Sequence, residues 1–166
     1  SEPEPHTSFA EMPFDALVEQ AADPHQRDGI AVIVEAHAPD GSPVETRAPV
    51  VRPTPELLHG LGSIIQNAVQ FASATVEITV GWDEDGTLSV EVEDDGPGFA
   101  PSVLSRLGEP YVSTRAGRDG HMGLGLFIAR TLLERTGAEL SFANREDGGA
   151  RVDVRWPGGL RLDPPR

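Results

Sequence analysis

The chain has 166 residues, enough for one domain with a buried core. Its 13 basic and 27 acidic residues give a net charge of −14, so we expect neither nucleic acid nor an anionic membrane as a partner. Cysteine is absent, which excludes disulfides, thiolate metal sites and cysteine nucleophiles. All 13 basic residues are arginine, which also excludes a P-loop lysine and Schiff-base chemistry.

The first elements follow a short polar segment. Residues 1–8 contain prolines and no apolar period, which predicts a linker before the domain that we expect over residues 9–157. Apolar residues at helical spacing predict a helix from Phe14 that ends before Pro24. Residues 30–38 and 43–51 then read as two strands joined into a hairpin.

The rest of the chain shows the same two periodicities, 3.6 residues for helices and 2 for strands. We expect helices over residues 55–72, 102–107 and 124–136, and strands over residues 76–80, 88–92, 140–143 and 150–156. A glycine-rich segment, residues 96–125, interrupts this order and predicts a mobile lid over about residues 99–122. Residues 158–166 form a C-terminal tail.

Strands paired mostly by hairpins, with long helices between them, predict an α+β fold. We expect a two-layer sandwich in which helices cover one face of a mixed sheet. A doubly wound parallel sheet does not fit this order.

The first candidate for chemistry is Asp94. It continues the inward-facing positions of the strand that contains Val90 and Val92. A buried carboxylate needs an internal donor or a ligand that presents an N–H group. The alternative is that residues 94–98 simply form a tight turn.

Two further segments could meet a nucleotide. On the helix over residues 55–72, Ser63, Asn67 and Gln70 share a polar edge next to Phe71. An asparagine oxygen suits Mg²⁺ and a phenyl ring suits a base, although Asn67 could equally be an ordinary exposed residue. Residues 120–125 place glycines at a helix start, where backbone N–H groups and the helix dipole favour phosphate. Their spacing is not the dinucleotide fingerprint, so a Rossmann fold is not expected.

Together these motifs resemble the ATP-binding catalytic domain of bacterial sensor histidine kinases, in the GHKL superfamily with its Bergerat fold. Residues 66–68 are similar to the N box, 94–99 to the G1 box, 107–114 to the F box and 120–126 to the G2 box. The wording of residues 108–115, 120–123 and 127–137 looks most like the RegB/PrrB redox-responsive kinases.

The resemblance implies the cofactors ATP and Mg²⁺ and a role for each motif. Asp94 would accept a hydrogen bond from the adenine amino group, and Asn67 would hold Mg²⁺ against the phosphates. Arg115 would join Asn67 in catalysis by stabilising the γ-phosphate. The other implied nucleotide contacts are Gln70, Phe71, Gly96, Gly98, Tyr111, Ser113, Thr114, Arg118, His121, Met122, Gly123, Leu124, Gly125 and Leu126.

The sequence departs from the family pattern at two positions. Ser63 stands where many kinases have asparagine and where ATP-hydrolysing relatives have a general-base glutamate. Gln70 stands where a basic phosphate-binding residue is common. A GHKL ATPase, a serine-protein kinase and a nucleotide-free interaction module are therefore kept as alternatives.

A histidine kinase also needs a phosphate acceptor, a histidine followed by an acidic residue. None of the five histidines has that neighbour, and the surface is expected to expose His25, His37 and His59. The resemblance therefore implies a catalytic piece of a larger kinase, whose partners are its own dimerisation domain and a response regulator. It also implies a cytoplasmic domain without direct membrane contact, in a parent anchored in the inner membrane.

Overall fold

The computed structural model describes residues 10–38, 43–44, 47–107 and 120–160. Its main element is a five-stranded sheet with the order β2-β4-β5-β7-β6. The strands are β2 (Ala31–His37), β4 (Thr75–Trp82), β5 (Leu88–Asp94), β6 (Glu139–Asn144) and β7 (Ala150–Trp156). β2 runs parallel to β4 and every other neighbouring pair is antiparallel, which confirms the mixed sheet and two of the three predicted hairpins.

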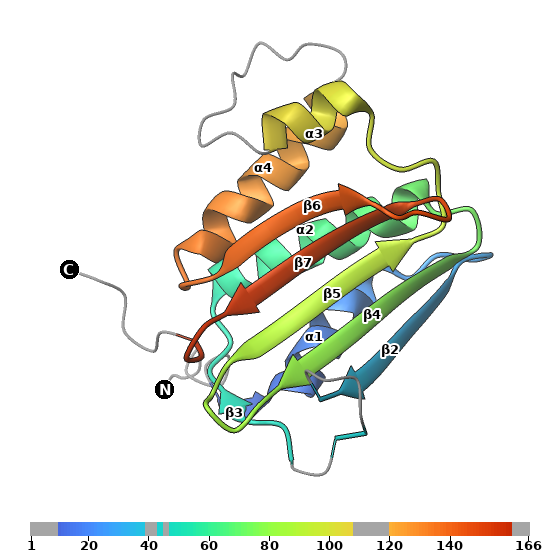
Figure 1. The fold of residues 1–166 in the computed structure, drawn as a ribbon. Coiled ribbons are helices and arrows are strands. Elements are labelled where there is room, and N and C mark those ends of the chain that lie inside the picture. Colours follow the sequence, from blue (N-terminus) through green and yellow to red (C-terminus); the bar gives the residue numbers. More distant parts are fainter. Residues whose placement is uncertain (1–9, 39–42, 45–46, 108–119, 161–166) are drawn as a thin grey trace, which may run out of the picture.

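Helices cover one face of this sheet and leave the other face open, as Figure 1 shows. The covering layer consists of α1 (Phe14–Ala22), α2 (Pro55–Phe71) and α4 (Gly120–Glu134). The short helix α3 (Pro101–Leu107) packs against α4, and a 3-10 turn, η2 (Asp23–His25), follows α1. The predicted two-layer sandwich is therefore confirmed.

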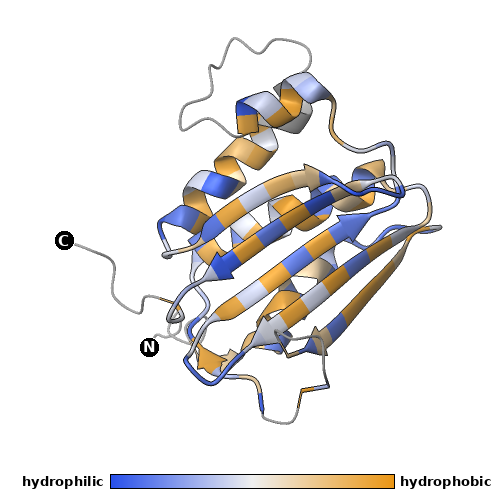
Figure 2. Ribbon diagram, in the orientation of Figure 1, coloured by the Kyte–Doolittle hydropathy of each residue, from blue (hydrophilic) through white to orange (hydrophobic). Residues whose placement is uncertain are grey.

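The core lies between these two layers. Hydropathy alternates along the strands in Figure 2, and the inward residues Val76, Ile78 and Val80 of β4 are at most 1% exposed. Phe14 of α1 and Trp156 of β7 meet edge to face with ring centroids 5.6 Å apart. This contact ties the first helix to the last strand.

Helix α2 begins and packs as its sequence predicts. The Thr54 side chain accepts a hydrogen bond from Leu57 N at 3.2 Å, and Pro55 occupies the first helical position. Gly60 lets α4 approach closely, since a Cβ at this position would lie 2.5 Å from Leu133 Cγ. The close helix pair positions the ends of α2 and α4 relative to each other.

The hairpin predicted over residues 30–51 is wrong in its second strand. Within the described part of that segment, only Val50–Val51 (β3) is strand, and it pairs with β1 (Met12–Pro13) instead of β2. A single bridge, His37 to Pro43, remains of the expected pairing. Pro43 and Pro49 lack the N–H groups that a continuous ladder needs, which explains the break.

Helix α4 starts at Gly120, four residues before the predicted start at Leu124. A glycine lowers helix stability by about 1 kcal/mol but does not prevent the helical conformation. Packing of Leu126, Ala129 and Leu133 in the core favours the helix. Its end is as predicted, with Gly137 at φ +96° just after the last turn. Within the described residues, no helix has the length and apolarity needed to cross a membrane.

Candidate functional site

Asp94 is the last residue of β5, and its side chain lies on the inward face of the sheet. The burial of β5 alternates from Leu88 to Asp94, and Asp94 is only 4% exposed. The prediction that this carboxylate is buried is therefore confirmed. In Figure 1 the end of β5, the C-terminal end of α2 and the turn between β6 and β7 gather at one end of the molecule.

The two oxygens of the Asp94 carboxylate have different surroundings. Oδ1 accepts hydrogen bonds from Gly96 N at 2.8 Å and Ala150 N at 3.5 Å. Oδ2 accepts no hydrogen bond from any residue that the structure describes. Burial raises the pKa of Asp94, and the Gly96 and Ala150 N–H groups oppose this shift. A ligand N–H group at Oδ2 would satisfy the acceptor that is left.

The neighbouring Asp95 has a structural role that the sequence did not predict. Its Oδ1 accepts hydrogen bonds from the backbone N–H groups of Ser73, Ala74 and Thr75 at 2.8, 3.0 and 3.2 Å. These bonds lower the pKa of Asp95, the Ala74 N–H contributing most. Asp95 thereby fixes the end of β5 to the connection between α2 and β4.

The polar edge of α2 reaches the same region through its C-terminal residues. Asn67 and Phe71 are half-buried, whereas Gln70 is exposed. The Asn67 amide makes no hydrogen bond within the described residues, so its oxygen is available to a ligand. Phe71 lies beside Gly96 of the segment that follows β5.

The start of α4 supplies the third part of the site. Leu124 and Gly125 are exposed there, and a Cβ at Gly125 would meet nothing within 4 Å. Leu126 is completely buried in the core, so its side chain does not reach a surface site. Tyr111, Ser113, Thr114, Arg115 and Arg118 lie outside the described residues, and so do the side chains of His121 and Met122 and the surroundings of Gly123.

A separate groove of about 430 Å³ lies between α1, α2 and α4, and none of the predicted nucleotide contacts lines it. His25, His59 and Ser63 are among its lining residues. His25 is half-buried, and this burial lowers its pKa, which corrects the expectation of a fully solvated surface histidine.

Comparison with protein families decides which fold family this arrangement represents. The model described as histidine kinase-, DNA gyrase B- and HSP90-like ATPase matches residues 54–159. The chain belongs to this family. The segment matched by this ATPase family contains the end of α2, the end of β5 and the start of α4, and the resemblance found in the sequence is thereby confirmed.

The curated relatives within this ATPase family include sensor histidine kinases. RegB of Cereibacter sphaeroides is 41% identical over 167 residues, which cover 89% of this chain and 35% of RegB. CarS of Pseudomonas aeruginosa is 38% identical over 102 residues, which cover 61% of this chain and 22% of CarS. The chain thus spans about a third of the length of RegB.

Solved structures show the same ATPase fold. Full-length ShkA in complex with AMPPNP is 26% identical with a TM-score of 0.67, covering 96% of this chain and 33% of ShkA. The catalytic domain of histidine kinase ThkA has 20% identity and a TM-score of 0.65, covering 92% of this chain and 99% of that domain. The histidine kinase domain of the Escherichia coli osmosensor EnvZ has 18% identity and a TM-score of 0.65, covering 100% and 96%.

Proposed function

We propose that this domain binds Mg²⁺-ATP and transfers the γ-phosphoryl group to a histidine on a separate dimerisation domain. The observation that carries the proposal is the buried Asp94 carboxylate, whose Oδ2 lacks a donor among the described residues. An adenine amino group is a donor of the required kind. The AMPPNP complex of ShkA, a relative in fold and sequence, supports a nucleotide ligand.

Asn67 is the residue that would hold Mg²⁺. Its amide oxygen has no competing hydrogen bond within the described residues, and a neutral oxygen ligand suits a cation that keeps phosphate oxygens and waters. When bound, Mg²⁺ neutralises charge on the phosphates. Phe71 would line the base, Gln70 would lie at the exposed rim, and Gly96 and Gly98 would let the backbone pass close to the adenine.

The exposed start of α4 would bind the phosphates through backbone N–H groups. Gly123, Leu124, Gly125 and Leu126 would contribute through their backbone, and His121 and Met122 as neighbours in the same motif. Arg115 and Arg118, with Tyr111, Ser113 and Thr114, would close over the nucleotide. This electrostatic arrangement stabilises the charge on the transferred group while the acceptor histidine nitrogen bonds to phosphorus and ADP leaves.

The wider setting follows from the relatives. RegB and CarS are named as sensor kinases, which supports a larger parent that contains the dimerisation domain and acts on a response regulator. By its likeness to RegB we further propose redox sensing and a parent anchored in the inner membrane, with this domain in the cytoplasm.

Nucleotide binding is tested by titrating ADP and ATP with Mg²⁺ and measuring the melting temperature. A ligand at 100 times its Kd stabilises the folded state by about 2.7 kcal/mol. We expect Asp94→Asn to abolish this stabilisation and the exposed-residue control Glu77→Gln to retain it. Stabilisation that is unchanged in Asp94→Asn would reject the adenine site.

Phosphoryl transfer is tested by mixing the domain with the dimerisation domain of its parent and ATP. We expect phosphohistidine on the added domain and slow ATP hydrolysis without it, because position 63 is a serine where hydrolysing relatives have a general base. Rapid steady-state hydrolysis by the isolated chain would favour an ATPase instead.

A further inference from the structure

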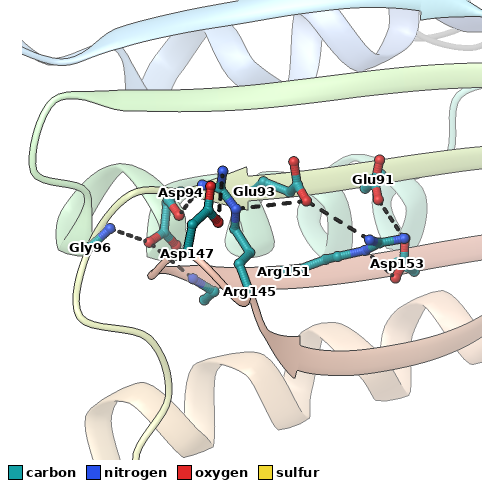
Figure 3. A network of polar contacts seen from close by, with 9 residues as sticks. Glu91, Glu93, Asp94, Gly96, Arg145, Asp147, Arg151 and Asp153 are labelled. Atoms are coloured by element: carbon teal, nitrogen blue, oxygen red, sulfur yellow. Dashed lines mark hydrogen bonds and ion pairs between the residues drawn. The ribbon is translucent and has the colours of Figure 1, made fainter.

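The turn between β6 and β7 lies against the strand end that carries Asp94. Arg145 Nη1 donates a hydrogen bond to the Asp94 carbonyl oxygen at 2.9 Å. The same guanidinium lies 3.9 Å from Glu93 Oε2 and 3.6 Å from Asp147 Oδ1, as Figure 3 shows. Its side chain is only 24% exposed, so this position is well defined and partly shielded from water.

The backbone of the turn brings Arg145 to this place. Arg145 N donates to Gly149 O at 2.8 Å, and Gly148 N donates to Arg145 O at 3.2 Å. Gly149 has φ +108°, and a Cβ there would overlap the Asp94 carbonyl oxygen. The turn and the strand end are therefore packed together without room for a side chain.

The residue before Arg145 holds the other end of the same segment. Asn144 Oδ1 accepts a hydrogen bond from Phe99 N at 2.7 Å, and Asn144 Nδ2 donates to Phe99 O at 3.0 Å. Two consecutive residues of the turn thus fix residues 94 and 99, which bound the segment expected to meet adenine. None of the motifs recognised in the sequence includes this turn.

We propose that Arg145 is a positioning residue for adenine recognition, acting through Asp94. It fixes the main chain of Asp94 and so directs the free Oδ2 toward the base, and its positive charge favours the ionised carboxylate. Asp95 opposes that effect, whereas Glu93 and Asp147 share the same guanidinium. This inference rests on the proposed nucleotide site, because it assigns the turn to the adenine half of that site.

The test compares ADP with IDP, whose base lacks the exocyclic amino group. We expect Arg145→Met to weaken ADP binding about tenfold while IDP binding changes little, because only ADP uses Asp94 Oδ2 as an acceptor. Arg145→Lys should recover part of the loss, since a lysine can donate to the same carbonyl. ADP binding by Arg145→Met should also fail at a higher pH than in the wild type as the solution is acidified, because the Asp94 pKa rises without the arginine.

Arg151→Met is the matched control. Arg151 belongs to the same network, 2.6 Å from Glu91 and 3.0 Å from Asp153, but makes no contact with Asp94. We expect it to leave the ADP-to-IDP ratio unchanged. Equal loss of ADP and IDP binding in Arg145→Met, or an unchanged ratio, would overturn the role of Arg145. A wild type that binds neither nucleotide would instead overturn the proposed function.

Discussion

The backbone of Gly96 lies directly against the carbonyl oxygen of Phe71, the last residue of α2. A Cβ at position 96 would overlap this oxygen, and Asp94 Oδ1 would lie 3.1 Å from it. The contact joins two motifs that are far apart in the sequence. It therefore sets the separation between the Asn67 side of the site and the Asp94 side.

Gly96→Ala is expected to destabilise the fold by about 1 to 3 kcal/mol, because overlap with backbone cannot be relieved by a side-chain rotation. The strand end must move away from α2, so ADP affinity should fall as well. Urea unfolding and calorimetry measure the two effects. Pro97→Ala at the exposed next residue serves as the control and should cost less than about 1 kcal/mol. Equal stabilities of Gly96→Ala and wild type would contradict this packing.

Asp94→Asn should make the ligand-free domain more stable at neutral pH while removing nucleotide binding. Burial raises the pKa of Asp94, so the folded state holds this proton more tightly than the unfolded state. Its contribution to stability is complete below the unfolded pKa and is lost as the pH rises through the folded pKa. The neutral amide has no such pH dependence. Thermal unfolding at several pH values from 3 to 8 measures the difference, and a lower melting temperature of Asp94→Asn at neutral pH would contradict it.

Asp95→Ala should have the opposite pH dependence. Backbone N–H groups, that of Ala74 above all, lower the pKa of Asp95, so its stabilisation is present above the unfolded pKa and is lost as the pH falls through the folded pKa. We expect a loss of about 1 kcal/mol at neutral pH, because the three donors lose a charged acceptor at a partly exposed site. The loss should vanish in strong acid. The exposed Glu84→Ala, measured in the same series, should show no such trend.

Gly125→Ala should raise stability and lower nucleotide affinity. Alanine favours a helix interior by up to about 1 kcal/mol over glycine, and the added Cβ meets no atom within 4 Å in the ligand-free domain. That space is where we expect phosphate to approach the backbone of α4. Thirty-fold or weaker changes are readily resolved by calorimetry, and Thr131→Ala on the same helix should raise helix propensity without changing affinity. Unchanged ATP binding by Gly125→Ala would separate the helix start from the phosphate site.

Much of the fold and site follows from local pattern. Helical spacing in residues 55–72, strand alternation in residues 76–80 and 88–92, and glycine at position 137 each depend on neighbours a few residues away. The inward direction of Asp94 follows from the same alternation, because successive side chains of a strand point to opposite faces. For these features the chain needs no information from distant segments.

Only the tertiary structure decided which distant segments meet. β3 pairs with β1 and not with β2, Asp95 bonds to residues 20 to 22 positions earlier, and Arg145 reaches Asp94 across 51 positions. Such contacts depend on how the helical layer and the sheet close around a shared core, and no local period encodes that closure. The acidic residue at position 94 was therefore evident from the sequence, whereas the arginine that positions it required the folded chain.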